Sequence, residues 1–124
     1  MQKYKTRRIS LGKKSYEAII ADTSTKRAIG LMFREHLPAG QCMLFTFSGE
    51  GSHAIWMRNM RFPIDAVWLD RNNTVIDVKQ DLKPCTSIFN CPQYEPRTRA
   101  YYLIEVNAGD CRKAGIKPGT RAKL

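Results

Sequence analysis

Short runs of alternating apolar and polar residues, separated by turn-forming residues, constrain this sequence more than any other feature. A period of two places the apolar side chains on one face of a β-strand. The runs at 5–11 and 15–21 flank the turn-forming stretch Gly12-Lys13-Lys14 and predict a β-hairpin. Further strands are predicted over 42–47, 54–59, 64–69, 74–78 and 100–106, with a short edge strand near the C-terminus.

Two short helices are predicted between these strands. Thr23, Ser24 and Thr25 are all suitable N-caps for the first helix, in which apolar residues recur at helical spacing as far as Met32. The second helix is predicted to have Asn107 as its N-cap and to end at Gly115. The fold is therefore expected to be mainly β: a compact jelly-roll-like sandwich or partly closed barrel of about seven or eight short strands with two short helices. Residues 1–124 are expected to form one domain, because the length is typical of one and no linker divides the chain.

The formal net charge of +10 is concentrated at the two ends of the chain. Residues 1–34 contain nine Lys and Arg against two acidic residues, giving +7, and residues 83–124 contain eight against three, giving +5. The central residues 35–82 contain four against six, giving −2. If the two ends meet in the fold, they form one basic face suited to the phosphates of RNA or single-stranded DNA. A solvated, solubilising surface is the alternative interpretation.

Five sequence blocks, in order along the chain, resemble one protein family. The blocks are Gly30-Leu31-Met32-Phe33-Arg34, Met43-Leu44-Phe45-x-Phe47, Trp56-Met57-Arg58-Asn59-Met60, Pro63-Ile64-Asp65 and Glu105-Val106-Asn107-Ala108-Gly109. Over residues 15–124 the chain resembles the small prokaryotic proteins called domain of unknown function 192, or uncharacterised protein family 0127. The resemblance implies a compact, mainly β, jelly-roll-like sandwich with short helices, and it implies no established reaction.

Candidate ligand-binding residues come from these blocks: Arg34, Trp56, Met57, Asn59, Asp65 and Glu105. Trp56 and Met57 can form apolar pocket walls, whereas Asn59 can hydrogen-bond to a ligand. Asp65 falls on the apolar face of its strand, so an inward carboxylate there needs a partner such as Arg34 or Arg58. An ion pair that specifies the fold and a ligand site both remain open for Asp65.

Motifs for catalysis or cofactor binding are scarce in this sequence. It contains no GxSxG elbow, Walker loop or GxGxxG motif, and the stretch 48–52 predicts a flexible turn. Only His36 and His53 are available as histidine ligands, so no metal or cofactor is expected. A hydrolase-like enzyme would need Asp65 and Glu105 within roughly 10 Å in one cleft, with His53 as an accessory group.

The cysteines indicate the redox environment of the chain. Cys85 and Cys91 have a spacing that fits neither a zinc knuckle nor a thioredoxin motif. No secretory signal is recognisable, so we expect a cytoplasmic location and reduced thiols, with a loop-closing disulfide or a weak metal site as alternatives. Cys42 and Cys111 are expected to be small buried apolar residues. No apolar run is long enough to span a bilayer, so no membrane partner is expected.

Three functions are consistent with these features. The first prediction is a non-enzymatic β-sandwich module that binds a small polar or carbohydrate-like ligand through the candidate residues. Binding of nucleic acid by a basic face at the chain ends is the alternative. Hydrolysis by Asp65 and Glu105 is the second alternative. The sequence indicates no oligomeric state.

Overall fold

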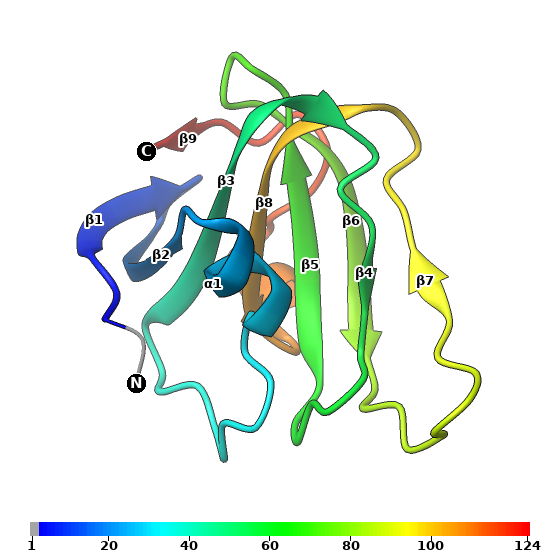
Figure 1. Cartoon of the computed structure of the whole chain (residues 1–124). Helices are drawn as coiled ribbons and strands as arrows, with labels where there is room; N and C mark the ends of the chain where they lie inside the picture. Colours follow the sequence, from blue (N-terminus) through cyan, green and yellow to red (C-terminus); the bar gives the residue numbers. More distant parts are fainter. Residues whose placement is uncertain (1–2) are drawn as a thin grey trace.

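A long, curled β-sheet dominates the structure, a computed structural model that describes residues 3–124 (Figure 1). Its seven strands lie in the order β6-β5-β8-β3-β2-β1-β9, and a separate two-stranded sheet pairs β4 with β7. The strands are β1 Thr6–Leu11, β2 Lys14–Ala21, β3 Gln41–Gly51, β4 Ile55–Trp56, β5 Ile64–Leu69, β6 Val75–Leu82, β7 Gln93–Tyr94, β8 Ala100–Asn107 and β9 Ala122–Lys123. The helices are α1 Ser24–Ile29 and α2 Asp110–Ala114. The predicted mainly β fold with two short helices is confirmed.

The curl of the large sheet brings its two edges together. Neighbouring strands are antiparallel except β2 and β3, which are parallel and are joined through α1, because a parallel pair needs a crossover connection. At the start of β6, the Val75 N–H donates to the Thr120 carbonyl at 2.8 Å, and the Gly119 N–H donates to the Val75 carbonyl at 2.8 Å. These bonds join β6 to the segment that leads into β9. Of the two predicted forms, the structure therefore has the partly closed barrel.

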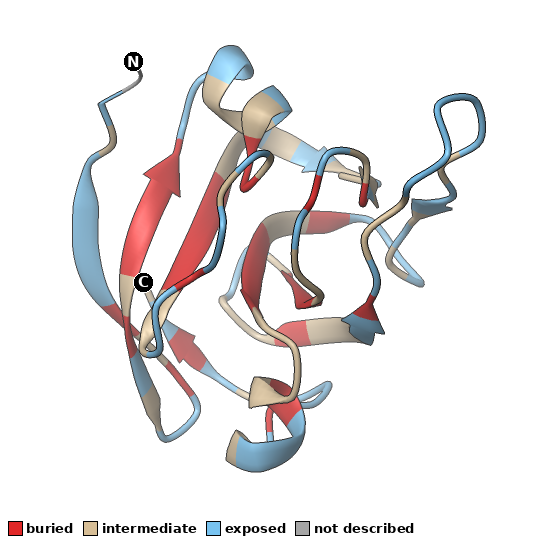
Figure 2. Cartoon of the chain, turned by 90° about the horizontal axis from the view of Figure 1, so that it is seen from below, coloured by how far each residue is buried: buried red, intermediate tan, exposed pale blue. Residues whose placement is uncertain are grey.

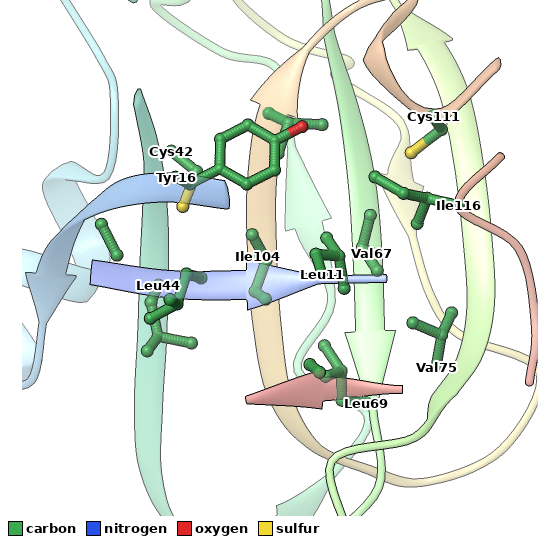
Figure 3. Close-up of a cluster of buried hydrophobic side chains, with 14 of the residues drawn as sticks. Leu11, Tyr16, Cys42, Leu44, Val67, Leu69, Val75, Ile104, Cys111 and Ile116 are labelled. Carbon is green, nitrogen blue, oxygen red and sulfur yellow. The ribbon is translucent and has the colours of Figure 1, made fainter. Parts of the chain in front are cut away.

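Two apolar clusters pack against the two faces of the large sheet. The first fills the inside of the curl and includes Val75 of β6 and Cys111 of α2 (Figure 3). Ala122 of β9 belongs to the same cluster, which therefore combines side chains from both edges of the sheet. The second covers the outer face and includes Trp68 of β5 and Leu31, which follows α1. Buried residues accordingly follow the central strands, whereas β1 and the helices are largely exposed or half-buried (Figure 2). Each large apolar side chain buried in this way contributes about 2 kcal/mol to folding.

The first helix begins as predicted and ends earlier. The Thr23 hydroxyl accepts a hydrogen bond from the Lys26 N–H at 3.1 Å, so Thr23 is the N-cap among the three predicted candidates. The helix ends at Ile29, before Met32, because Gly30 turns the chain with a φ of 52°. In residues 3–124 no helix has the length and apolar character needed to cross a membrane.

Two neighbouring segments differ from the sequence prediction. Residues 48–52, predicted as a flexible turn, largely belong to β3, which extends to Gly51. The register of β3 against β8 shifts between Thr46 and Gly51, so an irregularity in the strand absorbs the additional residues. The strand predicted over 54–59 is reduced to the two residues of β4, and the chain cannot stay extended at Asn59, whose φ is 59°.

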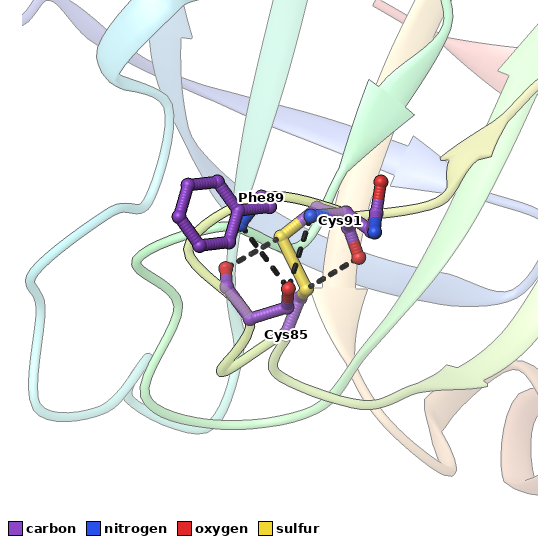
Figure 4. The surroundings of a disulfide bond; sticks show 5 residues. Cys85, Phe89 and Cys91 are labelled. Carbon is purple, nitrogen blue, oxygen red and sulfur yellow. Dashed lines mark hydrogen bonds between the residues drawn. A yellow bond between two sulfur atoms is a disulfide. The ribbon is translucent and has the colours of Figure 1, made fainter.

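A disulfide joins Cys85 and Cys91, which corrects the expectation of reduced thiols (Figure 4). Their Cα atoms lie 5.8 Å apart, within the usual range for a disulfide. The bond closes a loop that carries Phe89, which is 84% exposed. Cys42 and Cys111 are buried free thiols, as expected.

Candidate functional site

Glu105 lies on β8, between β3 and β5 of the large sheet. Its register partners are Met43 on β3 and Ala66 on β5, so the three side chains point to the same face. Met43 and Ala66 belong to the apolar cluster of the outer face. The strand alternation therefore places a carboxylate, which is only 6% exposed, among apolar side chains.

The Glu105 carboxylate has no partner among residues 3–124: it accepts no hydrogen bond there and forms no ion pair. Every fully buried side-chain N or O atom in this part of the chain does have a hydrogen-bond partner. The carboxylate oxygens must therefore reach a cavity instead of being sealed in the core. Desolvation by burial raises the pKa of Glu105 from 4.5 to about 8, because burial disfavours the charged form.

A cavity of about 210 Å³ borders Glu105, between α1, the segment that follows α1, β3 and β4. Its walls are mostly apolar and include Leu31, Phe45 and Met60. Trp56 lines the cavity and is 40% exposed, so it lies at the rim. Apolar walls around a few polar groups are typical of small-molecule sites, and the volume lies below the range of about 300 to 1,000 Å³ that drug-sized ligands occupy. The cavity is thus suited to a smaller molecule.

Gly30 and Arg27 shape the side of the cavity formed by α1. A Cβ atom at Gly30 would lie 3.4 Å from the Cζ atom of Phe45, so glycine lets the chain leave the helix and close against this ring. Arg27 donates from Nη1 to the Thr46 carbonyl at 2.9 Å, and its guanidinium carbon lies 5.4 Å from the centre of the Phe47 ring. These contacts hold the guanidinium against β3.

Asp65 and Glu105 lie on opposite faces of the sheet. In the register of β5 with β8, Asp65 pairs with Val106, and Ala66 pairs with Glu105. Successive residues of a strand point to opposite faces, so the two carboxylates cannot share a cleft. The prediction of a hydrolase built on this carboxylate pair is therefore wrong.

Asp65 is fully buried and binds backbone N–H groups. Its Oδ1 accepts from the Asp81 N–H at 2.8 Å, and its Oδ2 accepts from the N–H groups of Gly109 at 3.1 Å and Cys111 at 3.0 Å. The last two bonds satisfy donors at the start of α2, whose N-cap is Gly109 and not the predicted Asn107. Asp65 forms no ion pair among residues 3–124, so the prediction of an arginine partner is wrong.

The remaining predicted residues are not among those that line the cavity. The guanidinium of Arg34 stacks on an N-terminal tyrosine ring at 5.5 Å from its centre. Met57 is buried in the apolar cluster of the outer face, and Asn59 is exposed. Of the six candidates, Trp56 and Glu105 are the two that line this cavity together. Among residues 3–124, no group of three or more His, Cys, Asp and Glu side chains is arranged to hold a metal ion.

A basic surface forms where the two ends of the chain meet. The antiparallel pairing of β1 with β9 brings the N-terminal and C-terminal basic segments together. Lys13, Lys14 and Lys113 line an open hollow of about 360 Å³ beside Asp110. We call this feature the lysine hollow.

Fold and site together define a class of protein: a curled β-sheet that carries a small, mostly apolar cavity with a buried carboxylate on its outer face. The family model DUF192, described as Uncharacterized ACR, matches residues 7–124. This chain belongs to the DUF192 family, and the resemblance predicted from the sequence blocks is confirmed.

Two curated relatives support this family assignment. The chain is 38% identical over 104 residues to UPF0127 protein PH1112 of Pyrococcus horikoshii. The aligned region covers 82% of this chain and 80% of that protein. The chain is 29% identical over 100 residues to UPF0127 protein TK1120 of Thermococcus kodakarensis. That match covers 81% of this chain and 59% of the relative, so the chain spans less than two thirds of the second protein.

Two solved structures have the same fold. A protein of Sinorhizobium meliloti, described as a "putative transcription regulator", superposes with a TM-score of 0.91 over 99% of this chain and 96% of its own. A protein of unknown function from Novosphingobium aromaticivorans superposes with a TM-score of 0.88 over 96% of this chain and 85% of its own. Both are 23% identical to this chain, and at that identity the similarity shows the fold alone.

Proposed function

We propose that this protein is a non-enzymatic binding module for a small polar ligand that occupies the cavity beside Glu105. The observation that carries this proposal is the buried Glu105 carboxylate, which borders the cavity and has no partner among residues 3–124. The carboxylate oxygens open onto the cavity, where a ligand with a hydrogen-bond donor can bind them, and such a bond contributes about 0.5 to 1.5 kcal/mol. Trp56 at the rim offers an apolar ring for packing, and carbohydrates belong to this ligand class because they combine hydroxyl donors with apolar ring faces.

Trp56 supplies an optical signal for the test. It is partly exposed, whereas Trp68 is fully buried, so a ligand in the cavity changes mainly the emission of Trp56. The protein is titrated separately with glucose, benzyl alcohol, benzylamine and benzoate. Ala54 lines the cavity, so Ala54→Phe should fill it, and Ala39→Phe at an exposed position elsewhere is the matched control.

The proposed function predicts saturable binding of at least one compound to the wild type and to Ala39→Phe, and loss of that binding in Ala54→Phe. Circular dichroism of each variant checks that the fold is retained. Absence of saturable binding by all four compounds contradicts the proposal. Binding that persists unchanged in a folded Ala54→Phe variant contradicts it as well.

A second candidate function is nucleic-acid binding at the lysine hollow and at β1, which carries basic residues. The pairing of β1 with β9 favours it, because the two basic ends then form one surface. Anisotropy of a labelled single-stranded RNA, measured over a range of salt concentrations, tests this candidate. A phosphate-binding surface predicts an affinity that falls steeply with salt, with a shallower slope when Lys13, Lys14 and Lys113 are replaced by Gln. Absence of binding at low salt rejects it.

A cytoplasmic location remains a proposal, and the disulfide between Cys85 and Cys91 counts against it. Disulfides persist mainly in oxidising compartments, whereas cytosolic thiols are kept reduced. Alkylation of the protein during rapid cell lysis, followed by mass spectrometry, decides the point. Two alkylated thiols at these positions support the cytoplasm, and an unmodified disulfide contradicts it.

A further inference from the structure

We propose that the ligand of this cavity carries a protonated amino group, which the Glu105 carboxylate binds at the floor of the cavity. This inference rests on the proposed function, because it names the chemical class of the ligand for the same site. An ionised carboxylate is a pure hydrogen-bond acceptor, and among residues 3–124 no cation pairs with Glu105. Ionisation of this buried carboxyl group is costly without a counter-ion, and a ligand that brings a positive charge and N–H donors supplies one.

The walls of the cavity suit the same chemistry. Phe45 and Trp56 both line it, and the negative faces of aromatic rings attract cations within about 6 Å of the ring centre. The Trp56 ring already accepts such a contact, since the guanidinium carbon of Arg58 lies 5.3 Å from its centre. A small organic ammonium can thus combine ionic and aromatic contacts in one cavity. An organic anion would instead meet the buried carboxylate of Glu105.

Arg27 is the one other charged residue among those that line the cavity. Its like charge opposes a cation at the rim, but its guanidinium is bound to the Thr46 carbonyl and stacked over Phe47. No ion pair joins Arg27 to Glu105. The ammonium group is therefore placed at Glu105 and not beside the guanidinium of Arg27, which the carboxylate of a zwitterionic amino acid can approach.

Binding of an ammonium group to Glu105 is linked to the release of a proton. Burial raises the pKa of Glu105 to about 8, so at neutral pH the free protein mostly holds this carboxyl group in its protonated form. Benzylamine stays protonated over this pH range, because its amino group has a higher pKa, close to that of ordinary amines. The affinity for benzylamine should rise about 50-fold between about pH 6 and about pH 8, as Glu105 ionises.

Isothermal titration calorimetry with matched compounds tests the inference. Benzylamine carries the charge, and benzyl alcohol is its uncharged counterpart of nearly equal shape. We expect the wild type to bind benzylamine at least about tenfold more tightly, with an observed enthalpy that depends on the buffer because a proton is released. Glu105→Gln should weaken benzylamine binding about 10- to 100-fold and leave benzyl alcohol binding nearly unchanged. Glu50→Gln, at an exposed position of β3, is the matched control and should behave as the wild type.

Phenylglycine, which adds a carboxylate to benzylamine, distinguishes a simple amine from an amino acid. Tighter binding than that of benzylamine assigns the ammonium group to an amino acid, and weaker binding assigns it to a simple amine.

The inference is overturned if benzyl alcohol binds as tightly as benzylamine, or if Glu105→Gln and pH leave benzylamine binding unchanged. Binding of benzyl alcohol or benzoate in the cavity would then still support the proposed function. If none of these compounds shows binding that Ala54→Phe abolishes, the proposed function itself is rejected.

Discussion

Replacing Glu105 by glutamine removes the charge of a buried carboxylate and keeps nearly the same shape. The pKa of the folded-state carboxyl is raised from 4.5 to about 8, so between these values the folded protein binds more protons than the unfolded chain. The stability of the wild type relative to Glu105→Gln must therefore fall as pH rises through this window, and must be constant above it. Integration of the linkage relation gives a relative loss of about 3 to 4 kcal/mol between about pH 5 and about pH 8.

Urea unfolding of both proteins across this pH range, followed by circular dichroism, measures the difference directly. The comparison cancels the contributions of all other titrating groups, because they are present in both chains. Glu50→Gln serves as the control, since it makes the same substitution at an exposed position of β3. Parallel profiles for the wild type and Glu105→Gln would refute the assignment of Glu105 as a desolvated carboxyl without a partner.

Three further predictions concern Asp65 and the cysteines. Asp65→Asn should lower the free energy of unfolding by about 2 to 4 kcal/mol, because the amide puts an N–H donor where a carboxylate oxygen accepts from backbone N–H groups. Its benzylamine affinity should stay unchanged, and a urea stability equal to that of the wild type would contradict the prediction. Reduction of the disulfide between Cys85 and Cys91 should cost about 2 kcal/mol, measured by urea unfolding with and without dithiothreitol, and equal midpoints would disprove it. Cys42 and Cys111 should resist iodoacetamide in the folded protein, because burial raises both thiol pKa values; mass spectrometry showing rapid labelling at either position would exclude this packing.

The local alternation of apolar and polar residues is sufficient to predict most strands of the large sheet. The alternation along 100–106 predicts the strand that the structure has as β8, since the period of a strand is a local property. The parallel pairing of β2 with β3 and the closure of β6 against the segment before β9 depend on contacts between distant residues. No local pattern encodes them, and the alternatives of sandwich and barrel could not be separated without them.

The site was only partly predictable for the same reason. Trp56 and Glu105 are predicted from their residue types, whereas the types of Leu31 and Phe45 do not distinguish cavity residues from core residues, although both lie in the family blocks. Asp65 was correctly placed on an apolar face, and its true partners were missed because they are backbone N–H groups. The Gly109 donor is 44 residues away in the sequence, and a backbone donor leaves no signal in residue type.

Amide chemical-shift mapping of the ¹⁵N-labelled protein during a benzylamine titration tests the central claim most directly. A site at Glu105 predicts saturable shifts concentrated at the amides of Gly30, Leu31 and Ile55, which surround the cavity, and a large loss of these shifts in Glu105→Gln. Saturable shifts concentrated instead at the lysine hollow, or shifts around the cavity that Glu105→Gln leaves unchanged, would contradict a binding site at Glu105.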